Sequence, residues 1–515
     1  MTVRSRWLGT VPYAEAEALQ RAVHAHADTD YLLLQEHPHV YTLGSSAKAE
    51  HVLRDPASVG AELVKADRGG DVTYHGPGQL VGYPIVSLAE WKAGQRDVVA
   101  YVRRLEDVLI AACADFGIAA GRSTGYTGVW VGDEKIAAIG VRVSRGRTRH
   151  GFALNVDPDL SMFDHIVPCG IRDRGVTSMA KLLGRPVEMK AVVDRVVERF
   201  AEAFDGDPTD RQDVAWHRPV RAEGIEVALT RKRPEWMRVR AHFDDGYLEL
   251  KQLARGLDLH TVCEEAGCPN IYECWSDRTA TFMINGDRCT RACGFCQVDT
   301  RKPLALDADE PQRVADAVGA LGLAHAVITC VARDDLPDGG ASGFAATVTA
   351  IGATSPGTAV ELLIADCKGD AASLATIFDA RPDVLNHNLE TVARLQRAVR
   401  PSAGYARSLA VLGRARAAGL VTKSGLILGM GETIAEVRAA LADLRSVGVD
   451  IVTIGQYLRP SAEHLPVAKW WHPDEFADLR DYGEALGFAH VESGPLVRSS
   501  YHAREGADRL VPAPH

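Results

Sequence analysis

Hydrophobic and polar positions follow a mixed strand and helix pattern in the first two fifths of the chain. Apolar runs at 31–44 and 80–88 are bounded by proline and glycine turns, which is typical of strands. Residues 127–156 read as a series of short strands with glycine turns. Apolar residues recur at helical spacing over 96–117 and 189–206. We therefore expect a mixed α/β domain over residues 1–204.

The rest of the chain alternates strand-like runs with helical segments. Helical spacing appears, for example, at 311–323 and 433–448. The strand-like runs are residues 280–285, 324–332, 359–366, 383–390, 419–431 and 451–458. Such alternation predicts a parallel sheet with crossover helices. Six units without a nucleotide-type G-x-G-x-x-G opening favour a partial (β/α)6 barrel, whose chemistry belongs at the C-terminal ends of the strands.

Between these two patterns lies a polar segment with three prolines, Pro208, Pro219 and Pro234. We interpret residues 205–235 as an interdomain linker that includes a possible short strand. The expected fold class is therefore α/β with two domains. The predicted boundaries are 1–204, 205–235 and 236–515.

Composition excludes several classes of protein. The 515 residues are 46% apolar and 24% charged, as in globular proteins, and the formal charge of −10 argues against a nucleic-acid binder. No apolar run approaches the ~18 residues that a membrane span needs, and the first residues lack the apolar core of a secretory signal. We expect no nucleic-acid or membrane partner and a cytoplasmic location, where cysteines stay reduced.

Three cysteines follow the first predicted strand of the barrel at the spacing C-x3-C-x2-C: Cys289, Cys293 and Cys296. A structural zinc site closes with four ligands, and a plain electron-transfer cluster also takes four thiolates. Three thiolates on a cubane cluster leave one iron open for a small molecule. The alternatives are a zinc knuckle or buried cysteines without a metal.

A second set lies just upstream at the spacing C-x4-C-x5-C: Cys263, Cys268 and Cys274. A cluster on these three thiolates needs a fourth ligand from elsewhere in the chain. Zinc remains an alternative, although neither set contains the paired C-x2-C knuckles of zinc sites. Cys330 and Cys367 lie in apolar strands outside both sets, and we interpret them as buried and inert.

The C-x3-C-x2-C loop resembles the radical S-adenosylmethionine enzymes. The segments "CEEAGCPNIYECW", "CTRACGFC", "VARDDLPDGGA", "NHNLETV", "PSAGYARSL", "TKSGLILGMGET", "QYLRPSAEHLPV" and "RSSYHA" together resemble lipoyl synthase over roughly residues 230–510. Gly294 is a departure, since many relatives carry proline there. The resemblance implies two [4Fe–4S] clusters and S-adenosylmethionine as cofactors.

The same resemblance implies roles for individual residues. The second cysteine set would hold an auxiliary cluster with Ser500 as its fourth ligand, although Ser499 remains an alternative. Asn386, Asn388 and Glu390 would contact the ribose or amino-acid part of S-adenosylmethionine. From spacing alone, these three are equally well explained as caps at a strand end.

The first domain contains two stretches with candidate chemistry. Residues 67–86 are rich in glycine, which allows close backbone approach to a ligand, although a glycine-rich hairpin would look the same. Cys169 stands in a Pro–Cys–Gly loop and is a candidate nucleophile if a cation such as Lys135 favours its thiolate. A lone cysteine is more often structural.

Together "HPHVYTLG", "RGGDVTYHGPGQ", "KIAAIGVRV", "HGFALNV" and "PCGI…GVTS" resemble octanoyltransferase, a family related in fold to biotin and lipoate protein ligases. The resemblance implies that Cys169 takes an octanoyl group as a thioester, without ATP, and that Lys135 assists. The residues expected to line the acyl site are Arg68, Gly69, Gly70, Asp71, Val72, Thr73, Tyr74, His75, Ala138, Ile139, Gly140, Gly151, Phe152 and Ala153.

The two resemblances imply a bifunctional enzyme of lipoate biosynthesis. Its expected partners are octanoyl-acyl carrier protein, lipoyl carrier domains of 2-oxoacid dehydrogenases or glycine cleavage protein H, and a flavodoxin- or ferredoxin-type electron donor. Four arginines at 142–149 form a candidate docking patch for acidic carriers, unless they are only a solvated hairpin. The alternatives are that only one half is active, or that the chain is a non-catalytic iron–sulfur scaffold.

Overall fold

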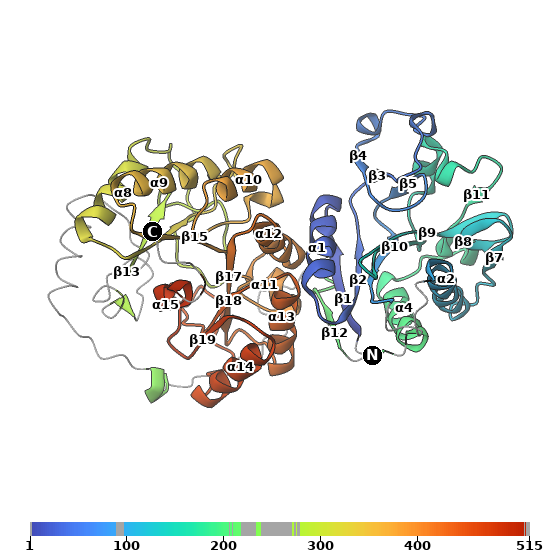
Figure 1. The fold of residues 1–515 in the computed structure, drawn as a ribbon. Helices are drawn as coiled ribbons and strands as arrows, with labels where there is room; N and C mark the ends of the chain where they lie inside the picture. The colour runs from blue at the N-terminus through green and yellow to red at the C-terminus, as the bar shows by residue number, and fades with distance from the viewer. Residues whose placement is uncertain are drawn as a thin grey trace. The chain divides into compact units, whose positions relative to one another are not determined.

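The computed structural model describes residues 3–88, 97–204, 206–208, 210–217, 233–237, 270–271, 274, 279–508 and 510. Contacts between Cα atoms divide the chain into two units, Met1–Trp216 and His217–His515. Each unit is an α/β fold with its own sheet (Figure 1). No helix among the described residues is long and apolar enough to cross a membrane.

The N-terminal unit is built on a large mixed sheet with the order β12-β1-β2-β6-β10-β9-β8-β7, and β11 also pairs with β9. A smaller sheet has the order β4-β3-β5. The strands are β1 (Val3–Thr10), β2 (Asp30–Glu36), β3 (Val40–Leu43), β4 (Glu62–Lys65), β5 (Val72–His75), β6 (Gln79–Ile85), β7 (Gly121–Ser123), β8 (Tyr126–Val131), β9 (Glu134–Ser144), β10 (Arg147–Asn155), β11 (Gly175–Val176) and β12 (Arg211–Asp213).

Helix α1 packs on β6 and β10, while α2 and α4 pack on each other and against the sheet. The helices of this unit are α1 (Tyr13–His26), α2 (Val98–Ala114), α3 (Met179–Leu183) and α4 (Met189–Ala203), with short 3-10 turns η1 (Ala49–His51), η2 (Pro56–Val59), η3 (Leu160–His165) and η4 (Pro168–Gly170). Helix α4 buries the apolar face that its spacing predicts, including Val192, Val196 and Phe200.

The N-terminal unit extends beyond residue 204. Strand β12 lies within the segment predicted to be a linker, and it pairs in parallel with β1. Trp216 stacks on Trp7 with ring centroids 4.4 Å apart. These contacts attach residues 211–216 of the predicted linker to the first unit.

The C-terminal unit is a seven-stranded parallel sheet in sequential order from β13 to β19. The strands are β13 (Thr279–Ile284), β14 (His325–Cys330), β15 (Ala359–Leu363), β16 (Val384–Asn386), β17 (Val421–Leu428), β18 (Ile451–Gln456) and β19 (His490–Ser493). Six correspond to the predicted strands. Sequence reasoning missed β19, which is only four residues long.

Helices cover the outer face of this sheet (Figure 1). The helices of this unit are α8 (Glu310–Leu321), α9 (Ala341–Thr354), α10 (Ala371–Asp379), α11 (Gln396–Val399), α12 (Tyr405–Ala417), α13 (Ile434–Ser446), α14 (Pro473–Ala485) and α15 (Ala503–Asp508), with 3-10 turns η5 (Glu235–Met237), η6 (Cys367–Gly369) and η7 (Ala393–Leu395). A capping box of Thr433 and Glu436 starts α13, and Pro311 stands in the first turn of α8.

The inner face of the sheet is polar. Alternate strand residues pack outward against the helices, as Ala326, Val360 and Leu385 do. On the opposite face, Lys423 Nζ lies 3.0 Å from Glu361 Oε2, and Asn386 Nδ2 donates to Glu361 Oε1 at 2.8 Å. A buried ion pair thus joins β15 and β17 inside the barrel.

Candidate active sites in the two units

The N-terminal unit contains a cavity of about 500 Å³, within the ~300–1,000 Å³ range of small-molecule sites. Cys169 and Lys135 both line it. Twelve of the residues expected at the acyl site line it as well: Arg68, Gly69, Gly70, Asp71, Thr73, His75, Ala138, Ile139, Gly140, Gly151, Phe152 and Ala153. The structure therefore brings the dispersed motifs of the first domain around one space.

Val72 and Tyr74 do not line the cavity, contrary to expectation. Strand residues alternate between faces, so Thr73 and His75 face the cavity while Val72 and Tyr74 face away. Both are fully buried in a core cluster with Tyr41 and Phe163, and Tyr74 also bonds to His39 at 2.7 Å. Consecutive residues of a motif do not share one surface when the motif lies on a strand.

Cys169 occupies a strained turn at the edge of this cavity. Its φ of 56° is in the left-handed region, and the next residue, Gly170, has a φ of 72°. A non-glycine residue in this conformation costs of order 1 kcal/mol or more and persists only when its surroundings hold it. The cysteine is half-buried, so its sulfur remains accessible from the cavity.

Two cations accompany Cys169. Arg68 is bound by Thr42, whose carbonyl and Oγ1 accept from Nη2 at 2.6 and 2.8 Å. Burial lowers the pKa of Arg68, and the neighbouring acidic groups Tyr13 and Cys169 oppose that shift. A guanidinium stays charged at neutral pH, so Arg68 places a fixed positive charge near the sulfur. Lys135 is buried, with its Nζ 4.8 Å from the centroid of Trp130.

Sequence reasoning missed four aromatic residues of this cavity, namely Tyr13, Tyr83, Tyr126 and His150. His150 Nε2 lies 2.6 Å from Asp67 Oδ1. Burial alone would raise the pKa of Asp67, but hydrogen bonds from His150 and Arg149 lower it to about 2. His150 directly precedes the recognised Gly151, whereas Tyr13 and Tyr83 carry no sequence signal because only the fold brings them here.

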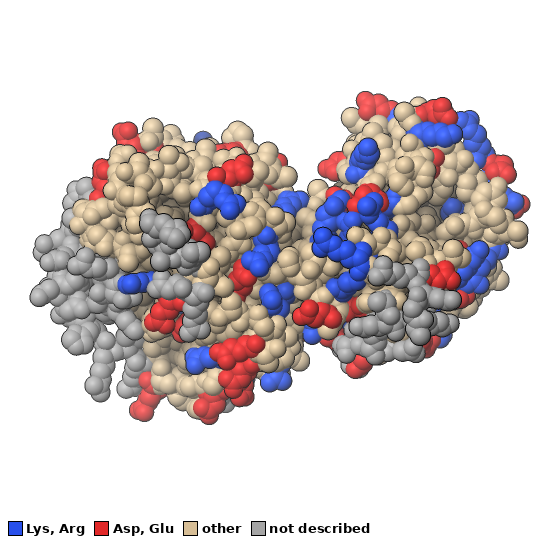
Figure 2. Space-filling model, in the orientation of Figure 1, with Lys and Arg blue, Asp and Glu red and all other residues tan. Residues whose placement is uncertain are grey.

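The arginine-rich segment 142–149 is only partly a surface patch. Arg147 donates to the carbonyls of Ala27 and Thr29, and Arg149 pairs with Asp67 at 2.6 Å. Arg142 and Arg145 are exposed. Figure 2 shows Lys and Arg side chains gathered around α1 on the visible face of this unit. Arg147 and Arg149 thus serve the fold. Arg142 also pairs with Asp67, at 3.6 Å, but like Arg145 it lies on the surface.

In the C-terminal unit the three cysteines of the C-x3-C-x2-C motif lie on the loop after β13, at the C-terminal edge of the sheet. Their thiols lie within electrostatic reach of one another. Burial raises the pKa of Cys293 to about 11, whereas the charge of Arg400 acts in the opposite direction. Burial also raises the pKa of Cys296. Iron must therefore displace protons from these thiols when it binds.

The three thiols of this loop are donors of the kind that hold an iron–sulfur cluster. Among the described residues, no three His, Cys, Asp or Glu side chains lie close enough to hold one metal ion. A cubane cluster is different, since each thiolate binds a different iron. Two buried oxygens, Asn388 Oδ1 and Glu390 Oε2, have no hydrogen-bond partner within the described part of the chain. Such atoms fit a polar cofactor that would satisfy them.

The three residues predicted to contact the cofactor are placed differently. Asn386 is inside the barrel, where its amide nitrogen bonds to Glu361. Glu390 has a φ of 68° and lies near Cys293 and Cys296. Burial raises the pKa of Glu390, and the charge of Arg400 opposes this shift. Glu390 thus lies beside the cysteine loop, whereas Asn386 lies inside the barrel.

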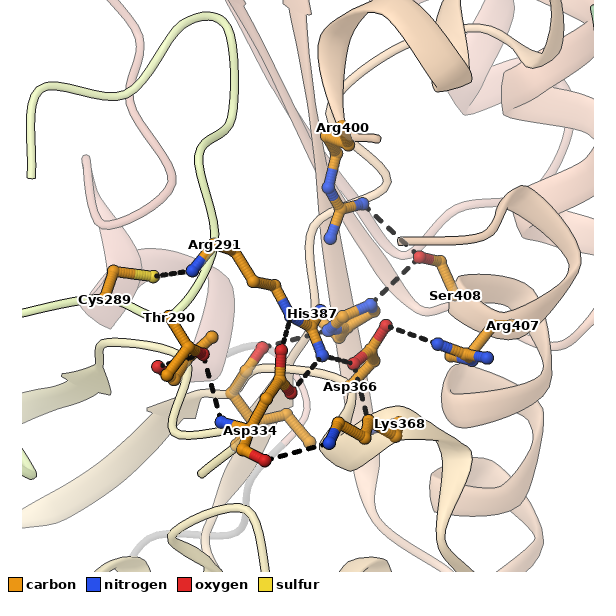
Figure 3. A network of polar contacts seen from close by, with 12 residues as sticks. Cys289, Thr290, Arg291, Asp334, Asp366, Lys368, His387, Arg400, Arg407 and Ser408 are labelled. Atoms are coloured by element: carbon orange, nitrogen blue, oxygen red, sulfur yellow. Dashed lines mark hydrogen bonds and ion pairs between the residues drawn. The ribbon is translucent and has the colours of Figure 1, made fainter. Parts of the chain in front are cut away.

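A polar network fixes the cysteine loop to the segments that follow β14 and β15 (Figure 3). Arg291 donates to Asp334 through Nε at 2.7 Å and Nη2 at 2.8 Å, and also through Nη2 to Asp366 at 2.5 Å. Thr290 Oγ1 donates to the carbonyl of Ala332 at 2.8 Å. Asp366 is also 3.7 Å from Arg407 on α12. The loop is therefore anchored by charge as well as by backbone.

A second anchor comes from the loop after β18. His464 Nε2 lies 2.9 Å from the carbonyl of Cys296, and the Leu465 N–H donates to the carbonyl of Gly294 at 2.9 Å. Gly294 in turn donates its N–H to Val399, and a Cβ there would lie 2.8 Å from Leu465 Cδ1. Proline at 294 would lose this hydrogen bond and crowd Leu465, so the glycine matches the local packing.

The second cysteine set is described only at Cys274, since Cys263 and Cys268 lie outside the described residues. The Cys274 N–H donates to the carbonyl of Asn270, and Asn270 Nδ2 donates to the carbonyl of Leu496 at 2.7 Å. This side chain therefore joins the segment of Cys274 to the one that leads into Ser499 and Ser500. Cys330 and Cys367 are thiols whose pKa burial raises to about 12.

Comparison with known proteins assigns each unit. Residues 12–201 match the family model of the lipoyl protein ligase A/B catalytic domain, and residues 283–444 match the radical SAM superfamily. Among solved structures, lipoate-protein ligase A bound with ATP is 18% identical, with a TM-score of 0.37, over 42% of this chain and 90% of its own. Methylornithine synthase is 14% identical, with a TM-score of 0.33, over 49% and 79%.

The curated relatives are more specific for the C-terminal part. Lipoyl synthase of Mycobacterium leprae is 60% identical over 272 residues, which are 53% of this chain and 87% of the relative. Lipoyl synthase of Mycobacterium tuberculosis is 60% identical over 53% of this chain and 88% of its own. The radical SAM lipoyl synthase family implies S-adenosylmethionine and iron–sulfur chemistry. The chain therefore belongs to the lipoyl synthase family, and it carries a lipoyl protein ligase A/B catalytic domain ahead of the radical SAM domain.

Proposed function

We propose that this chain performs two consecutive steps of lipoyl-group assembly. The N-terminal unit moves an octanoyl group from acyl carrier protein to a lysine of a lipoyl carrier domain. The C-terminal unit then inserts two sulfur atoms, at carbons 6 and 8 of that chain. The observation that carries the proposal is that Cys169 and Lys135 line one cavity in a chain whose other unit is a lipoyl synthase.

Acyl transfer follows from the contents of the cavity. The Cys169 sulfur attacks the carbonyl of the incoming thioester, so its S–C bond forms while the S–C bond to the donor breaks. The donor thiol leaves with a proton from Lys135. The carrier lysine then attacks the new thioester, its N–C bond forms, and Lys135 takes the amine proton as Cys169 is released. No ATP is required, because the thioester is already activated.

Charge supports both binding and reaction. Arg68, fixed by Thr42, and Lys135 bring two basic side chains to the cavity that Cys169 lines. Outside the cavity, Arg21 and Arg142 have side chains 51% and 48% exposed. With Arg145 they form a basic surface that would attract acidic acyl carrier proteins and lipoyl domains.

The C-terminal unit would hold two [4Fe–4S] clusters and S-adenosylmethionine. Cys289, Cys293 and Cys296 would hold the first cluster and leave one iron open, while Asn388 and Glu390 offer unpaired oxygens beside it. Cys263, Cys268, Cys274 and Ser500 would hold the second. When bound, these groups supply the 5′-deoxyadenosyl radical and the sulfur atoms. Arg291 and His464 keep the first loop in place.

The remaining partners are part of the same proposal. Reduction of the first cluster requires an electron donor of the flavodoxin or ferredoxin type, and the acceptor lysine comes from a 2-oxoacid dehydrogenase or glycine cleavage protein H. A reducing compartment such as the cytoplasm would keep the thiols available for iron.

One anaerobic experiment tests both steps. The reconstituted chain is given octanoyl-acyl carrier protein, an apo lipoyl domain, S-adenosylmethionine and dithionite, and the domain is weighed by mass spectrometry. A lipoyl mass supports both activities, whereas an octanoyl mass that never advances contradicts the second. An unmodified domain, with no cleavage of S-adenosylmethionine, would instead favour a non-catalytic scaffold.

A further inference from the structure

A buried pair of an aspartate and a histidine packs against the Pro168–Cys169–Gly170 turn. His51 Nδ1 lies 2.7 Å from Asp71 Oδ2, and the two side chains are only 9% and 11% exposed. A Cβ placed on Gly170 would lie 2.9 Å from Asp71 Oδ2 and 3.3 Å from His51 Cε1. The pair therefore touches the residue that follows Cys169.

The pair is itself fixed on both sides. Asp71 Oδ1 accepts from the N–H of Val72 at 2.6 Å, which ties the carboxylate to the start of β5. The carbonyl of His51 accepts from the N–H of Val167 at 2.8 Å, and Val52 forms a bridge with Ile166. The segment of His51 thus runs beside the chain that enters the Pro168–Cys169–Gly170 turn.

We propose that His51 and Asp71 are positioning residues, which hold the strained Pro168–Cys169–Gly170 turn so that the Cys169 sulfur is aimed at the acyl carbonyl. This inference rests on the proposed octanoyl transfer. Two successive left-handed residues do not keep one conformation without support. Gly170 is required here, because any side chain would displace the pair that provides this support.

The orientation of the Cys169 sulfur and its intrinsic reactivity can be measured separately. A sulfur displaced by ~1 Å can lose ~100-fold in reaction with a bound, oriented carbonyl. A small alkylating reagent approaches from many directions and is far less sensitive to aim. Loss of the pair should therefore slow acylation of Cys169 by an acyl thioester much more than its alkylation.

The test compares Asp71→Leu, His51→Ala and Asp71→Asn in the full chain, with Glu50→Ala as the matched control. Glu50 neighbours His51 on η1, and its Oε1 lies 4.0 Å from His51 Nε2, but its side chain is 69% exposed, so this contact is screened by solvent and worth little. Asparagine at 71 still accepts from Val72 and donates to His51 in its other tautomer, so it preserves the pair without the charge. The readouts are single-turnover acylation by octanoyl-acyl carrier protein and iodoacetamide labelling at fixed pH, both followed at Cys169 by peptide mass spectrometry.

We expect acylation about 10–100-fold slower in Asp71→Leu and His51→Ala, alkylation within about threefold, and near-normal acylation in Asp71→Asn and Glu50→Ala. Equal losses of acylation and alkylation would overturn the inference, as would failure of Asp71→Asn to restore acylation. Normal acylation in both disruptive variants would overturn it while leaving the proposed function intact. If the unaltered chain forms no acyl-Cys169, the proposed function fails and the inference with it.

Discussion

Arg291 and Asp366 form a buried ion pair, with Nη2 and Oδ1 2.5 Å apart, between the cysteine loop and the end of β15. The carboxylate is fully buried, and burial would by itself raise the pKa of Asp366. Hydrogen bonding and charge from Arg291 outweigh burial and lower it. Arg291 thus ties the loop that would carry the cluster to the barrel. Its removal would leave the charge of Asp366 buried.

Arg291→Ala is expected to destabilise the C-terminal unit by about 3–5 kcal/mol. The change breaks a buried ion pair and leaves the buried Asp366 carboxylate without the arginine it pairs with. Calorimetry of the full chain would show this as a lower temperature for one of two transitions. Arg301→Ala is the control, since Arg301 pairs with Asp299 on the surface and should cost under about 1 kcal/mol. Equal shifts for the two variants would contradict the proposed anchoring role.

Cys169→Ala and Cys289→Ala are expected to separate the two reactions. Cys169→Ala should lose octanoyl transfer but still convert an already octanoylated domain, because its cysteine loop is unchanged. Cys289→Ala should do the reverse and accumulate octanoyl product. Mass spectrometry of the carrier domain measures both, and loss of both steps in either variant would show that the sites are not independent.

Ser500→Ala should weaken the second cluster, whereas Ser499→Ala should not. Iron analysis after anaerobic gel filtration would give about eight irons per chain for Ser499→Ala and approach four for Ser500→Ala, as expected for one lost [4Fe–4S] group. The opposite pattern would assign the ligand to Ser499. Equal retention in both variants would mean that the fourth ligand lies elsewhere.

His464→Ala should speed loss of iron from the first cluster to a chelator. It removes the hydrogen bond to the carbonyl of Cys296, and a bond worth about 0.5–1.5 kcal/mol corresponds to roughly 2–12-fold in rate. The decay of cluster absorbance with bathophenanthroline measures it. His472→Ala is the control, because His472 caps α14 and makes no recorded bond to the cysteine loop.

Acid stability should depend on Glu361. Burial alone would raise the pKa of Glu361, but Lys423, followed by His325 and Asn386, lowers it to about 2 from 4.5. A lowered folded-state pKa gives stability that is present above pH 4.5 and is lost as pH falls toward 2. At about 1.4 kcal/mol per unit, the loss is at most about 3 kcal/mol.

Glu361→Gln should remove this dependence from the C-terminal transition, although it also lowers stability at pH 7 by leaving Lys423 unpaired. Glu463→Gln, a change at an exposed carboxylate, should keep it. Calorimetry between pH 5 and pH 3 compares the slopes. A slope in Glu361→Gln as steep as that of the unaltered chain would show that other carboxylates dominate.

Much of the architecture follows from local pattern, since each buried parallel strand reads as an apolar run and the turns carry glycine or proline. Strand β19 escaped notice because four residues, including His490 and Glu492, give no such run. Val72 and Tyr74 were misplaced because a motif does not show which strand face meets a ligand. His51 carries no motif at all, and its place beside the Cys169 turn depends on the bridge between Val52 and Ile166, which are more than a hundred residues apart.

Asp366 receives Arg291 from the cysteine loop and Arg407 from α12. One carboxylate therefore couples two segments more than a hundred residues apart in sequence. A replacement at any of these three positions would leave an unbalanced charge in the interior unless another changed with it. We therefore expect correlated substitutions among lipoyl synthases at three positions, those of Arg291, Asp366 and Arg407. Such correlation would reflect the anchoring of the cysteine loop.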